Sequence, residues 1–295
     1  MKRSTLYSIT LLVALAIGAY LALHREGEMS STGSSGKMLV DYDSSSVDKL
    51  EISNPAHSVV LEKKGGVWML TSPVEYEADE AAATAAVGRG RRIELSNLIS
   101  DNPDKQDLFQ VDSTGTHVRV YANGTLKASF YVGKAGSSYS ETYVRLDGSN
   151  DVQLARDVLS SIYNKQPKDW RDKTIFKADE GSIKNVKFQY GDTTFTLSQP
   201  DSMWLVDKDS ANQSAVKSLL TTVSHLQTDE FVDSMQSSPP KISAIITVGG
   251  TQLRFYKNAD SKYLVQSSDS PQWFEMQGYR TTNLLKRKKD FLPVK

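Results

Sequence analysis

The sequence predicts an α+β protein made of two tandem repeats of mostly antiparallel β-sheet with packed helices, after one N-terminal transmembrane helix. The features that predict it are an internal duplication, short segments of alternating apolar and polar residues, and a long uncharged run near the N-terminus. Each repeat spans about 120 residues, the size of one small domain. The sequence therefore says much about architecture and little about chemistry.

The duplication is visible as apolar positions that recur at one constant separation along the chain. Val47 matches Ile183, and Trp68 matches Trp204. Later matches are Asn123-Gly124 with Gly249-Gly250 between apolar runs, and Lys168-Asp169-Trp170 with Lys289-Asp290-Phe291 at the close of each copy. The predicted repeat units are therefore residues 39–173 and residues 174–295.

Composition excludes several classes of site. The chain has 295 residues, with 35 Lys and Arg against 35 Asp and Glu, so its formal net charge is zero. A neutral chain gives no electrostatic reason to expect a nucleic acid partner. The chain has no cysteine, which excludes disulfides, thiolate metal sites and cysteine nucleophiles.

The N-terminus predicts a membrane anchor. Lys2 and Arg3 precede an uncharged run in which the part from Leu6 to Leu23 can span a hydrocarbon core of about 30 Å. Positive charges before such a run favour a cytoplasmic N-terminus. Residues 1–25 are thus expected to be a cytoplasmic tip and single-pass anchor in a bacterial inner membrane, with the globular part periplasmic or otherwise extracytoplasmic. A cleaved signal peptide is the alternative, although its apolar core is usually only about 7–15 residues.

The next segment, residues 26–38, is rich in serine and glycine. Such a segment cannot bury apolar surface, so it is expected to be a flexible tether. It would separate the folded part from the membrane.

In the first repeat, alternating patterns and turn residues predict an antiparallel meander, a helix, a hairpin and a closing helix. Asn54-Pro55 is a break between strands, and Asn123-Gly124 is a strong hairpin signal. Gly88 and Gly90 weaken the helix, because each costs about 1 kcal/mol relative to alanine. The predicted strands are residues 47–53, 58–63, 67–71, 118–122, 126–132, 142–146 and 152–154, and the predicted helices are residues 79–95 and 155–163.

The second repeat follows the same order. Its main helix is predicted from apolar residues at helical spacing between Val216 and Leu226. The predicted strands are residues 183–190, 193–197, 203–206, 242–248, 252–256, 263–265 and 273–276, and the predicted helices are residues 211–226 and 278–288.

Several segments together resemble a known family. They are Gly66-Val67-Trp68-Met69-Leu70-Thr71-Ser72-Pro73 leading to Ala78-Asp79, then Val132-Gly133-Lys134, Thr142-Tyr143-Val144-Arg145-Leu146-Asp147-Gly148 and Trp170-Arg171-Asp172-Lys173. With the N-terminal apolar segment, they resemble the bacterial DUF4340 family, which has no assigned function. The resemblance implies an accessory extracytoplasmic role near ABC-type transporters or gliding-type envelope machinery. One departure is Phe109-Gln110-Val111-Asp112-Ser113, which lacks the proline that the family usually has there.

Motifs for catalysis are not found in the sequence. The histidines are His24, His57, His117 and His225, and none of them forms a zinc-binding pair by spacing. No G-x-S-x-G nucleophile elbow is present. Gly33-Ser34-Ser35-Gly36-Lys37 lacks the first glycine of a phosphate loop and the strand before it, so it is interpreted as tether. We therefore expect no cofactor, no metal and no enzymatic activity.

Two basic clusters are the candidate contacts with a partner or with lipid. The first is Arg89, Arg91 and Arg92, and the second is Lys286, Arg287, Lys288 and Lys289. Cations at a helix end also complement its dipole, which is the simpler interpretation of both clusters. Trp68 and Trp204 occupy matched positions and are expected in the core, because aromatic side chains bury large areas.

These observations favour a membrane-tethered, extracytoplasmic, non-catalytic interaction protein with a protein partner in the envelope. One alternative is an envelope hydrolase that uses Asp, Glu or His residues, for which a perturbed group in a deep pocket would be needed. The other is a lipid- or solute-binding protein, which would need a sizeable apolar cavity.

Overall fold

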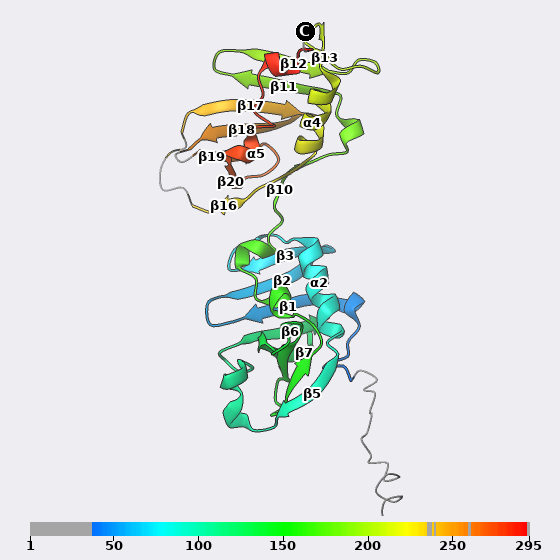
Figure 1. Ribbon diagram of the computed structural model, residues 1–295, viewed down its shortest axis with the longest axis vertical. Helices are drawn as coiled ribbons and strands as arrows, with labels where there is room; N and C mark the ends of the chain where they lie inside the picture. Colours follow the sequence, from blue (N-terminus) through cyan, green and yellow to red (C-terminus); the bar gives the residue numbers. More distant parts are fainter. Residues whose placement is uncertain (1–36, 235–237, 239, 259–260, 294–295) are drawn as a thin grey trace, which may run out of the picture. The chain divides into compact units, whose positions relative to one another are not determined.

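The chain folds into two nine-stranded sheets with corresponding strand orders, visible in Figure 1. This computed structural model describes residues 37–234, 238, 240–258 and 261–293. The first sheet has the order β4-β3-β2-β1-β6-β7-β8-β9-β5, and the second has the order β14-β13-β12-β11-β17-β18-β19-β20-β16. A separate two-stranded sheet pairs β10 with β15. Every strand of the first sheet therefore has a counterpart at the same place in the second.

The first sheet is built from two meanders, β1 to β4 and β6 to β9, with a helix between them in sequence. The strands are β1 Val47–Ser53, β2 Ser58–Lys64, β3 Val67–Ser72, β4 Tyr76–Glu77, β5 Leu95–Ser100, β6 Thr116–Ala122, β7 Thr125–Ala135, β8 Thr142–Leu146 and β9 Val152–Ala155. The helices are η1 Ser44–Ser46, α2 Glu80–Arg91, η2 Pro103–Lys105, η3 Asp107–Phe109, α3 Ser160–Tyr163 and η4 Pro167–Trp170.

The second sheet repeats this plan. The strands of this half are β10 Thr174–Lys177, β11 Asn185–Tyr190, β12 Thr194–Ser198, β13 Leu205–Val206, β14 Asp209–Ser210, β15 His225–Gln227, β16 Glu230–Val232, β17 Ile242–Val248, β18 Thr251–Lys257, β19 Lys262–Ser267 and β20 Trp273–Gln277. Its helices are η5 Glu180–Ser182, α4 Gln213–Val223, α5 Gly278–Thr281 and η6 Lys288–Phe291.

The predicted α+β class with packed helices is wrong, because the described chain is mostly antiparallel β-sheet. The predicted helix over residues 79–95 ends at Arg91, and Leu95 instead begins β5. Likewise, Leu226 has helical spacing with α4 but lies in β15, where it pairs with Phe176 of β10. The closing helices α3 and α5 have only four residues each. Short apolar runs fit the spacing of a helix and that of a strand, and hydrogen bonds to neighbouring strands make the segments of Leu95 and Leu226 extended.

No helix among the described residues is long and apolar enough to cross a membrane. The predicted span from Leu6 to Leu23 lies outside the described residues, as does the tether up to Gly36. The transmembrane helix in the predicted fold class therefore has no counterpart in the described part of the chain.

The chain forms two compact units. Among the described residues, the first unit comprises 37–66, Thr71–Pro73 and Ala81–Lys165. The second comprises Val67–Leu70, Val74–Glu80 and all residues from Gln166 onward. The repeat boundary between residues 173 and 174 stays a prediction.

Backbone hydrogen bonds recur at matched places, as the strand order does. Ala78 N donates to Trp68 O at 2.9 Å just before α2, and Ala211 N donates to Trp204 O at 3.0 Å before α4. The peptide that leads into each main helix is thus tied to the same tryptophan position in both copies.

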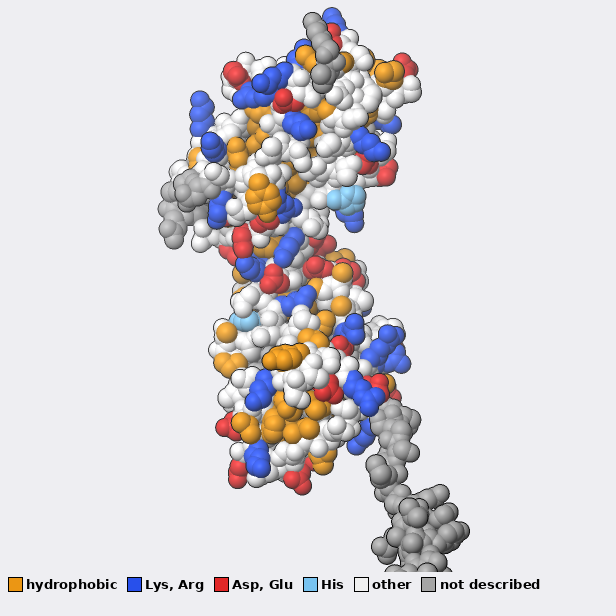
Figure 2. Space-filling model, viewed as in Figure 1, with side chains coloured by type: hydrophobic (Ala, Val, Ile, Leu, Met, Phe, Trp, Pro, Cys, Tyr) orange, Lys and Arg blue, Asp and Glu red, His pale blue; other side chains and the backbone are white. Residues whose placement is uncertain are grey.

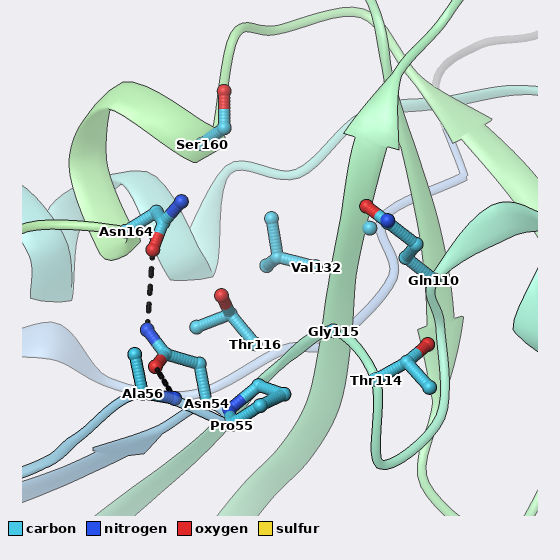
Figure 3. A pocket seen from close by; sticks show the side chains of 11 residues that line it. Asn54, Pro55, Ala56, Gln110, Thr114, Gly115, Thr116, Val132, Ser160 and Asn164 are labelled. Carbon is cyan, nitrogen blue, oxygen red and sulfur yellow. Dashed lines mark hydrogen bonds between the residues drawn. The ribbon is translucent and has the colours of Figure 1, made fainter.

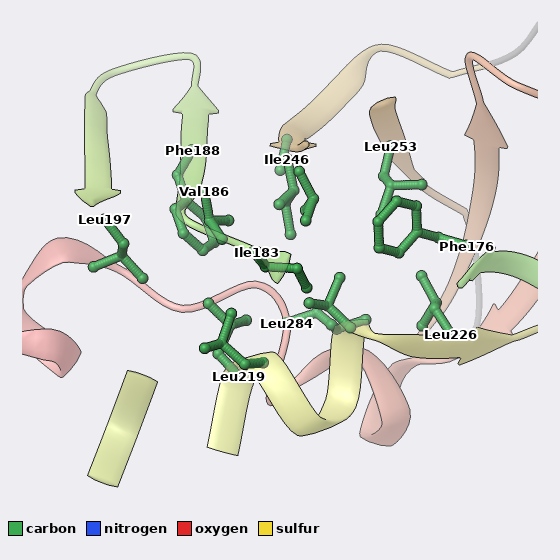
Figure 4. Packing of buried hydrophobic residues seen from close by; sticks show 14 of the residues in the cluster. Phe176, Ile183, Val186, Phe188, Leu197, Leu219, Leu226, Ile246, Leu253 and Leu284 are labelled. Atoms are coloured by element: carbon green, nitrogen blue, oxygen red, sulfur yellow. The ribbon is translucent and has the colours of Figure 1, made fainter. Parts of the chain in front are cut away.

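Each sheet buries one face beneath its helices. In the second unit, Phe188 and Phe195 stack at 4.7 Å, and Phe291 of η6 packs 6.0 Å from Phe195. Figure 4 shows side chains of α4, of the strands and of the closing segment converging in this core. The helix α4 contributes Val216, Leu219, Leu220 and Val223, whose spacing places them on one face.

Strand β6 shows how the alternation of residues sets the two faces of the first sheet. Val118 and Val120 are fully buried, whereas His117, Arg119 and Tyr121 between and beside them point to the opposite face. This opposite face is called the outer face below.

The glycine at the end of α2 has a packing reason. Tyr42 Oη donates to Val87 O at 2.8 Å, and Tyr163 Oη donates to Ala86 O at 2.6 Å. A Cβ atom on Gly90 would lie 2.4 Å from Tyr42 Oη and 2.8 Å from Tyr163 Oη. Burial raises the pKa of both tyrosines, so they remain neutral donors. Gly90 therefore lets two buried hydroxyl groups reach the helix backbone.

We expect Gly90→Ala to lower the free energy of unfolding by about 1–3 kcal/mol, because the new methyl group overpacks this site. Gly88→Ala is the matched control, since a Cβ there meets nothing within 4 Å. That control should gain up to about 1 kcal/mol from helix propensity. Urea denaturation measures both. Equal effects of the two substitutions would contradict the packing argument.

Trp68 and Trp204 are 1% and 7% exposed, so both are buried. Replacing Trp68 with alanine should cost about 3–5 kcal/mol in unfolding free energy, because a large cavity results. Tyr279→Ala serves as the control, since Tyr279 is 76% exposed and surface substitutions usually change stability by less than about 0.5 kcal/mol. A Trp68→Ala protein with unchanged stability would refute a core role.

Candidate functional site

The outer face of the first sheet carries a row of polar and aromatic side chains across neighbouring strands. The register pairs Ser53 of β1 with His117 of β6, His117 with Tyr131 of β7, and Tyr131 with Arg145 of β8. Side chains directly opposite one another on a sheet face are in contact range. Four strands thus bring together residues that are far apart in sequence.

The planar groups of this row are stacked. The His117 and Tyr131 rings are 4.3 Å apart and nearly parallel, and the Arg145 guanidinium lies 4.4 Å from the Tyr131 ring centroid. Arg145 is 7% exposed, and its Nε donates to Val111 O at 2.7 Å. Its Nη1 donates to Ser149 O at 2.8 Å. Arg145 thus holds the loop before β6 and the turn after β8 against the sheet.

His117, Ser129 and Asp147 form a closed triangle beside this row. His117 Nε2 is 2.8 Å from Ser129 Oγ, and Ser129 Oγ donates to Asp147 Oδ2 at 2.7 Å. His117 Nε2 is also 3.3 Å from Asp147 Oδ2. Burial, followed by the charge of Arg119, holds the pKa of His117 below its usual value, although Asp147 opposes this. The Ser129 hydrogen bond lowers the pKa of Asp147.

This triangle does not have the geometry of a hydrolase triad. In a triad the carboxylate binds one imidazole nitrogen, and the other nitrogen accepts the serine proton. Here Ser129 Oγ donates its proton directly to Asp147 Oδ2. His117 Nε2, the imidazole nitrogen near both groups, can therefore only donate to them and cannot accept the serine proton. The arrangement therefore stabilises a carboxylate and does not activate a nucleophile.

A hollow opens at the corner of the first unit, where the turn after β1, the loop before β6 and the start of α3 meet (Figure 3). We call it the corner hollow, and its volume is about 230 Å³. It is lined by Asn54, Pro55, Ala56, Gln110, Thr114, Gly115, Thr116, Val132, Gly133, Ser160 and Asn164. A neighbouring hollow of about 230 Å³ shares Asn54, Pro55 and Gly115 with it and reaches Asp112, His117 and Tyr131.

The mouth of the corner hollow is held by asparagine side chains. Asn54 Oδ1 accepts from Ala56 N at 2.9 Å and from His57 N at 3.0 Å, which fixes the turn. Asn54 Nδ2 donates to Asn164 Oδ1 at 3.1 Å. Figure 3 shows these two amides facing each other, with Gln110 and Thr114 on the opposite side.

Two glycines shape the floor and wall of the corner hollow. A Cβ on Gly133 would lie 2.2 Å from Phe109 O, and one on Gly115 would lie 1.7 Å from Gln110 O. The loop around Gln110, which itself has φ 57°, can therefore approach the sheet only because these positions lack side chains. Gly133 belongs to one of the segments on which the family resemblance rests.

The turn of the second unit that corresponds to the turn after β1 carries an aromatic residue in place of Asn54. The turn after β1 is closed by Asn54 N donating to His57 O, and the turn after β11 by Tyr190 N donating to Thr193 O. Tyr190 therefore stands where Asn54 stands. It is partly buried against the core of the second unit.

The closing segments correspond as well. His57 Nε2 is 2.8 Å from Lys165 O, and Tyr190 Oη donates to Lys286 O at 2.6 Å. Asn164, just before Lys165, thus matches Leu285, which is also packed against the second core. At these two places the first unit has amides where the second unit has an aromatic and an aliphatic residue.

Two residues of the second predicted basic cluster form local ion pairs. Arg287 Nη1 is 2.8 Å from Asp192 Oδ1, and its guanidinium lies 4.0 Å from the Tyr190 ring centroid. Lys288 Nζ is 2.6 Å from Asp207 Oδ2. Lys289 is exposed, and Lys286 contributes its carbonyl group to Tyr190. These contacts give two of the four residues a structural role.

The first predicted basic cluster lies at the end of α2. Arg89 Nη1 is 2.9 Å from Asp157 Oδ2, and Arg91 and Arg92 are exposed. On the face that Figure 2 shows, basic and acidic side chains are interspersed, with no large field of one sign. Contact of either cluster with a partner or with lipid stays a prediction.

Strand β5 has no charged residue, and at its start Leu95 N donates to Lys37 O at 2.9 Å. It ends the strand order of the first sheet and pairs with β9. Leu98 is 58% exposed and Ile99 is 37% exposed, and Leu108 in the following η3 is 58% exposed. The counterpart strand β16 begins with Glu230, and its Phe231 is packed against the second core.

These sites are not predicted by the sequence patterns. Asn54-Pro55 indicates only a break between strands, and Leu98 and Ile99 lie in none of the predicted elements. His117 was considered only for metal spacing. The mismatch between the aligned positions Asn54 and Tyr190 is a signal for the corner hollow, because a polar residue in one copy replaces an aromatic residue in the other.

The fold and the site define a duplicated β-sheet protein with a polar corner hollow in its first unit. The family model described as "Domain of unknown function (DUF4340)" matches residues 68–245, and the chain belongs to this family. The resemblance found in the sequence is thereby confirmed. No curated protein and no solved structure matches the chain. The matched residues include Gln110, Gly133 and Asn164 of the corner hollow and leave out Asn54.

The lowered pKa of His117 predicts a pH dependence of stability. Between the pKa of folded His117 and about 6.5, the unfolded chain binds more protons than the folded one. The free energy of unfolding should therefore fall as pH drops from about 6.5 through the folded pKa of His117. In the His117→Gln protein it should fall less over the same range. Arg119 and Arg145 disfavour the imidazolium, and Asp147 favours it. An NMR titration of His117 that gave a pKa above 6.5 would show that Asp147 outweighs burial.

Proposed function

We propose that this protein is a membrane-tethered, extracytoplasmic, non-catalytic interaction protein that binds a protein of the cell envelope through strand β5. The observation that carries the proposal is the uncharged edge strand with Leu98 and Ile99 exposed. Natural proteins usually protect an edge with charges, proline or a covering segment, and exposed apolar groups favour a partner. A partner strand added beyond Leu95, whose N already donates to Lys37 O, would pair with backbone groups of β5 and cover both side chains.

The sequence supports the location. The uncharged run from Leu6 to Leu23 after Lys2 and Arg3 favours an anchor with the folded part outside the cytoplasm. The family resemblance favours a partner among ABC-type transporter or gliding-type envelope components.

The alternatives fit the geometry less well. A hydrolase needs a base beside its nucleophile, whereas Ser129 donates to Asp147. A lipid-binding protein needs a large apolar cavity, whereas the corner hollow is small and includes amide and hydroxyl groups in its lining.

The natural absence of cysteine allows a clean test. We expect Leu98→Cys protein in intact spheroplasts to react with a membrane-impermeant maleimide and to give a discrete crosslinked product with a thiol-to-amine crosslinker. Leu126→Cys, with Leu126 49% exposed on β7, is the matched control and should react with maleimide but give no such product. Leu98→Asp should abolish copurification of the crosslinked protein, because a charge opposes burial.

Labelling of Leu98→Cys only after lysis would refute the extracytoplasmic location. Equal crosslinking at Leu98→Cys and Leu126→Cys would refute the specific contact at β5. These two results separate the location from the contact.

A further inference from the structure

We propose that the corner hollow of the first unit binds one uncharged sugar ring. This site is distinct from the β5 contact, because neither Leu98 nor Ile99 lines it. The inference goes beyond the proposed protein interaction and does not depend on it.

The lining selects a ligand without charge. None of the eleven described residues around the corner hollow has an ionisable side chain. Burying an ion there would cost hydration that nothing in the lining replaces. The hydrogen-bonding groups are amides and hydroxyls, which both donate and accept. A sugar ring offers the same mixture of donors and acceptors around its rim.

The shape selects a ring. The volume of about 230 Å³ lies below the roughly 300–1,000 Å³ of drug-sized sites, so it suits one small ring. Pro55 and Ala56, which are both exposed, line the hollow and give apolar surface for the C–H groups of a sugar. Thr116, which is 6% exposed, adds a hydroxyl group to the lining of the corner hollow.

A peptide strand fits this place less well. Strand β1 is paired on both sides, with β2 and β6, and β6 is paired on both sides, with β1 and β7. No ladder edge is therefore open at the corner for strand addition. The neighbouring hollow continues from Asn54 and Pro55 toward Asp112 and His117, so a second ring of an oligosaccharide would have space beside the first.

The second unit keeps the same strand order without the amide pair. There Tyr190 and Leu285 occupy the places of Asn54 and Asn164 and pack against the core. The fold therefore does not require amides at these two places. The amide pair is a polar departure confined to the first unit, and both of its residues line the corner hollow.

The test uses the full chain in detergent micelles and saturation-transfer NMR with N-acetylglucosamine and glucose as probes. We expect binding with a dissociation constant of about 1–10 mM, typical of a single small ring. Asn164→Leu introduces the residue of the second unit and should weaken binding at least about tenfold, since the loss of one buried polar contact has this size. Ser160→Leu is a second variant that fills the hollow from α3. Asn150→Leu, at an exposed turn outside the hollow, is the control and should bind as the parent does.

Cationic glucosamine should bind more weakly than N-acetylglucosamine, because the lining cannot compensate its charge. No saturation transfer to the parent protein up to about 50 mM of either neutral sugar would overturn the proposal. So would unchanged binding in both Asn164→Leu and Ser160→Leu proteins of parental melting temperature. Crosslinking at Leu98→Cys reports on the protein contact separately, so failure of one proposal is distinguishable from failure of the other.

Discussion

The antiparallel pairing of β1 with β6 is the interaction on which the rest of the first unit depends. It joins two meanders that are separated in sequence by α2 and by β5, and it makes one nine-stranded sheet of them. Such a long-range pairing costs loop-closure entropy, and the buried face of Val118 and Val120 against the β1 residues Leu50 and Ile52 offsets it. The same register sets Ser53 opposite His117 and so brings the outer-face row into line. Pairing of β11 with β17 performs this role in the second half.

Duplication separates what the fold requires from what one copy adds. Trp68 and Trp204 receive the same backbone hydrogen bond before the main helix, and both are buried. At the corner, by contrast, a polar pair in one copy stands where Tyr190 and Leu285 pack in the other. A residue needed for packing should be apolar in both copies, since both cores use the same geometry. The corner residues of the first unit do not meet this condition, and this difference is one reason for the proposal that they bind a ligand.

Polar side chains on the outer face hold loops against the first sheet. Arg145 donates to carbonyl oxygens of the loop before β6 and of the turn after β8, and its stacking on Tyr131 covers a face of the ring. The triangle around Asp147 satisfies a carboxylate with a hydroxyl and an imidazole. Arg145 is buried, and satisfied buried hydrogen bonds of this kind stiffen a structure. The loop before β6, which borders the corner hollow, is therefore presented by a rigid scaffold, as binding loops commonly are.

By itself the sequence determined the duplication, the family and most strands, because period-two alternation and turn residues such as Asn123-Gly124 act locally. Strands predicted at residues 47–53, 142–146 and 242–248 have the same bounds in the structure. The class was wrong because Leu95 and Leu226 fit helical spacing, and only pairing with β9 and β10 made those segments extended. The corner hollow was decided by tertiary structure alone. It needs Asn54 and Asn164, 110 positions apart, to meet across the closing segment, and no local pattern encodes a contact between residues so distant in the chain.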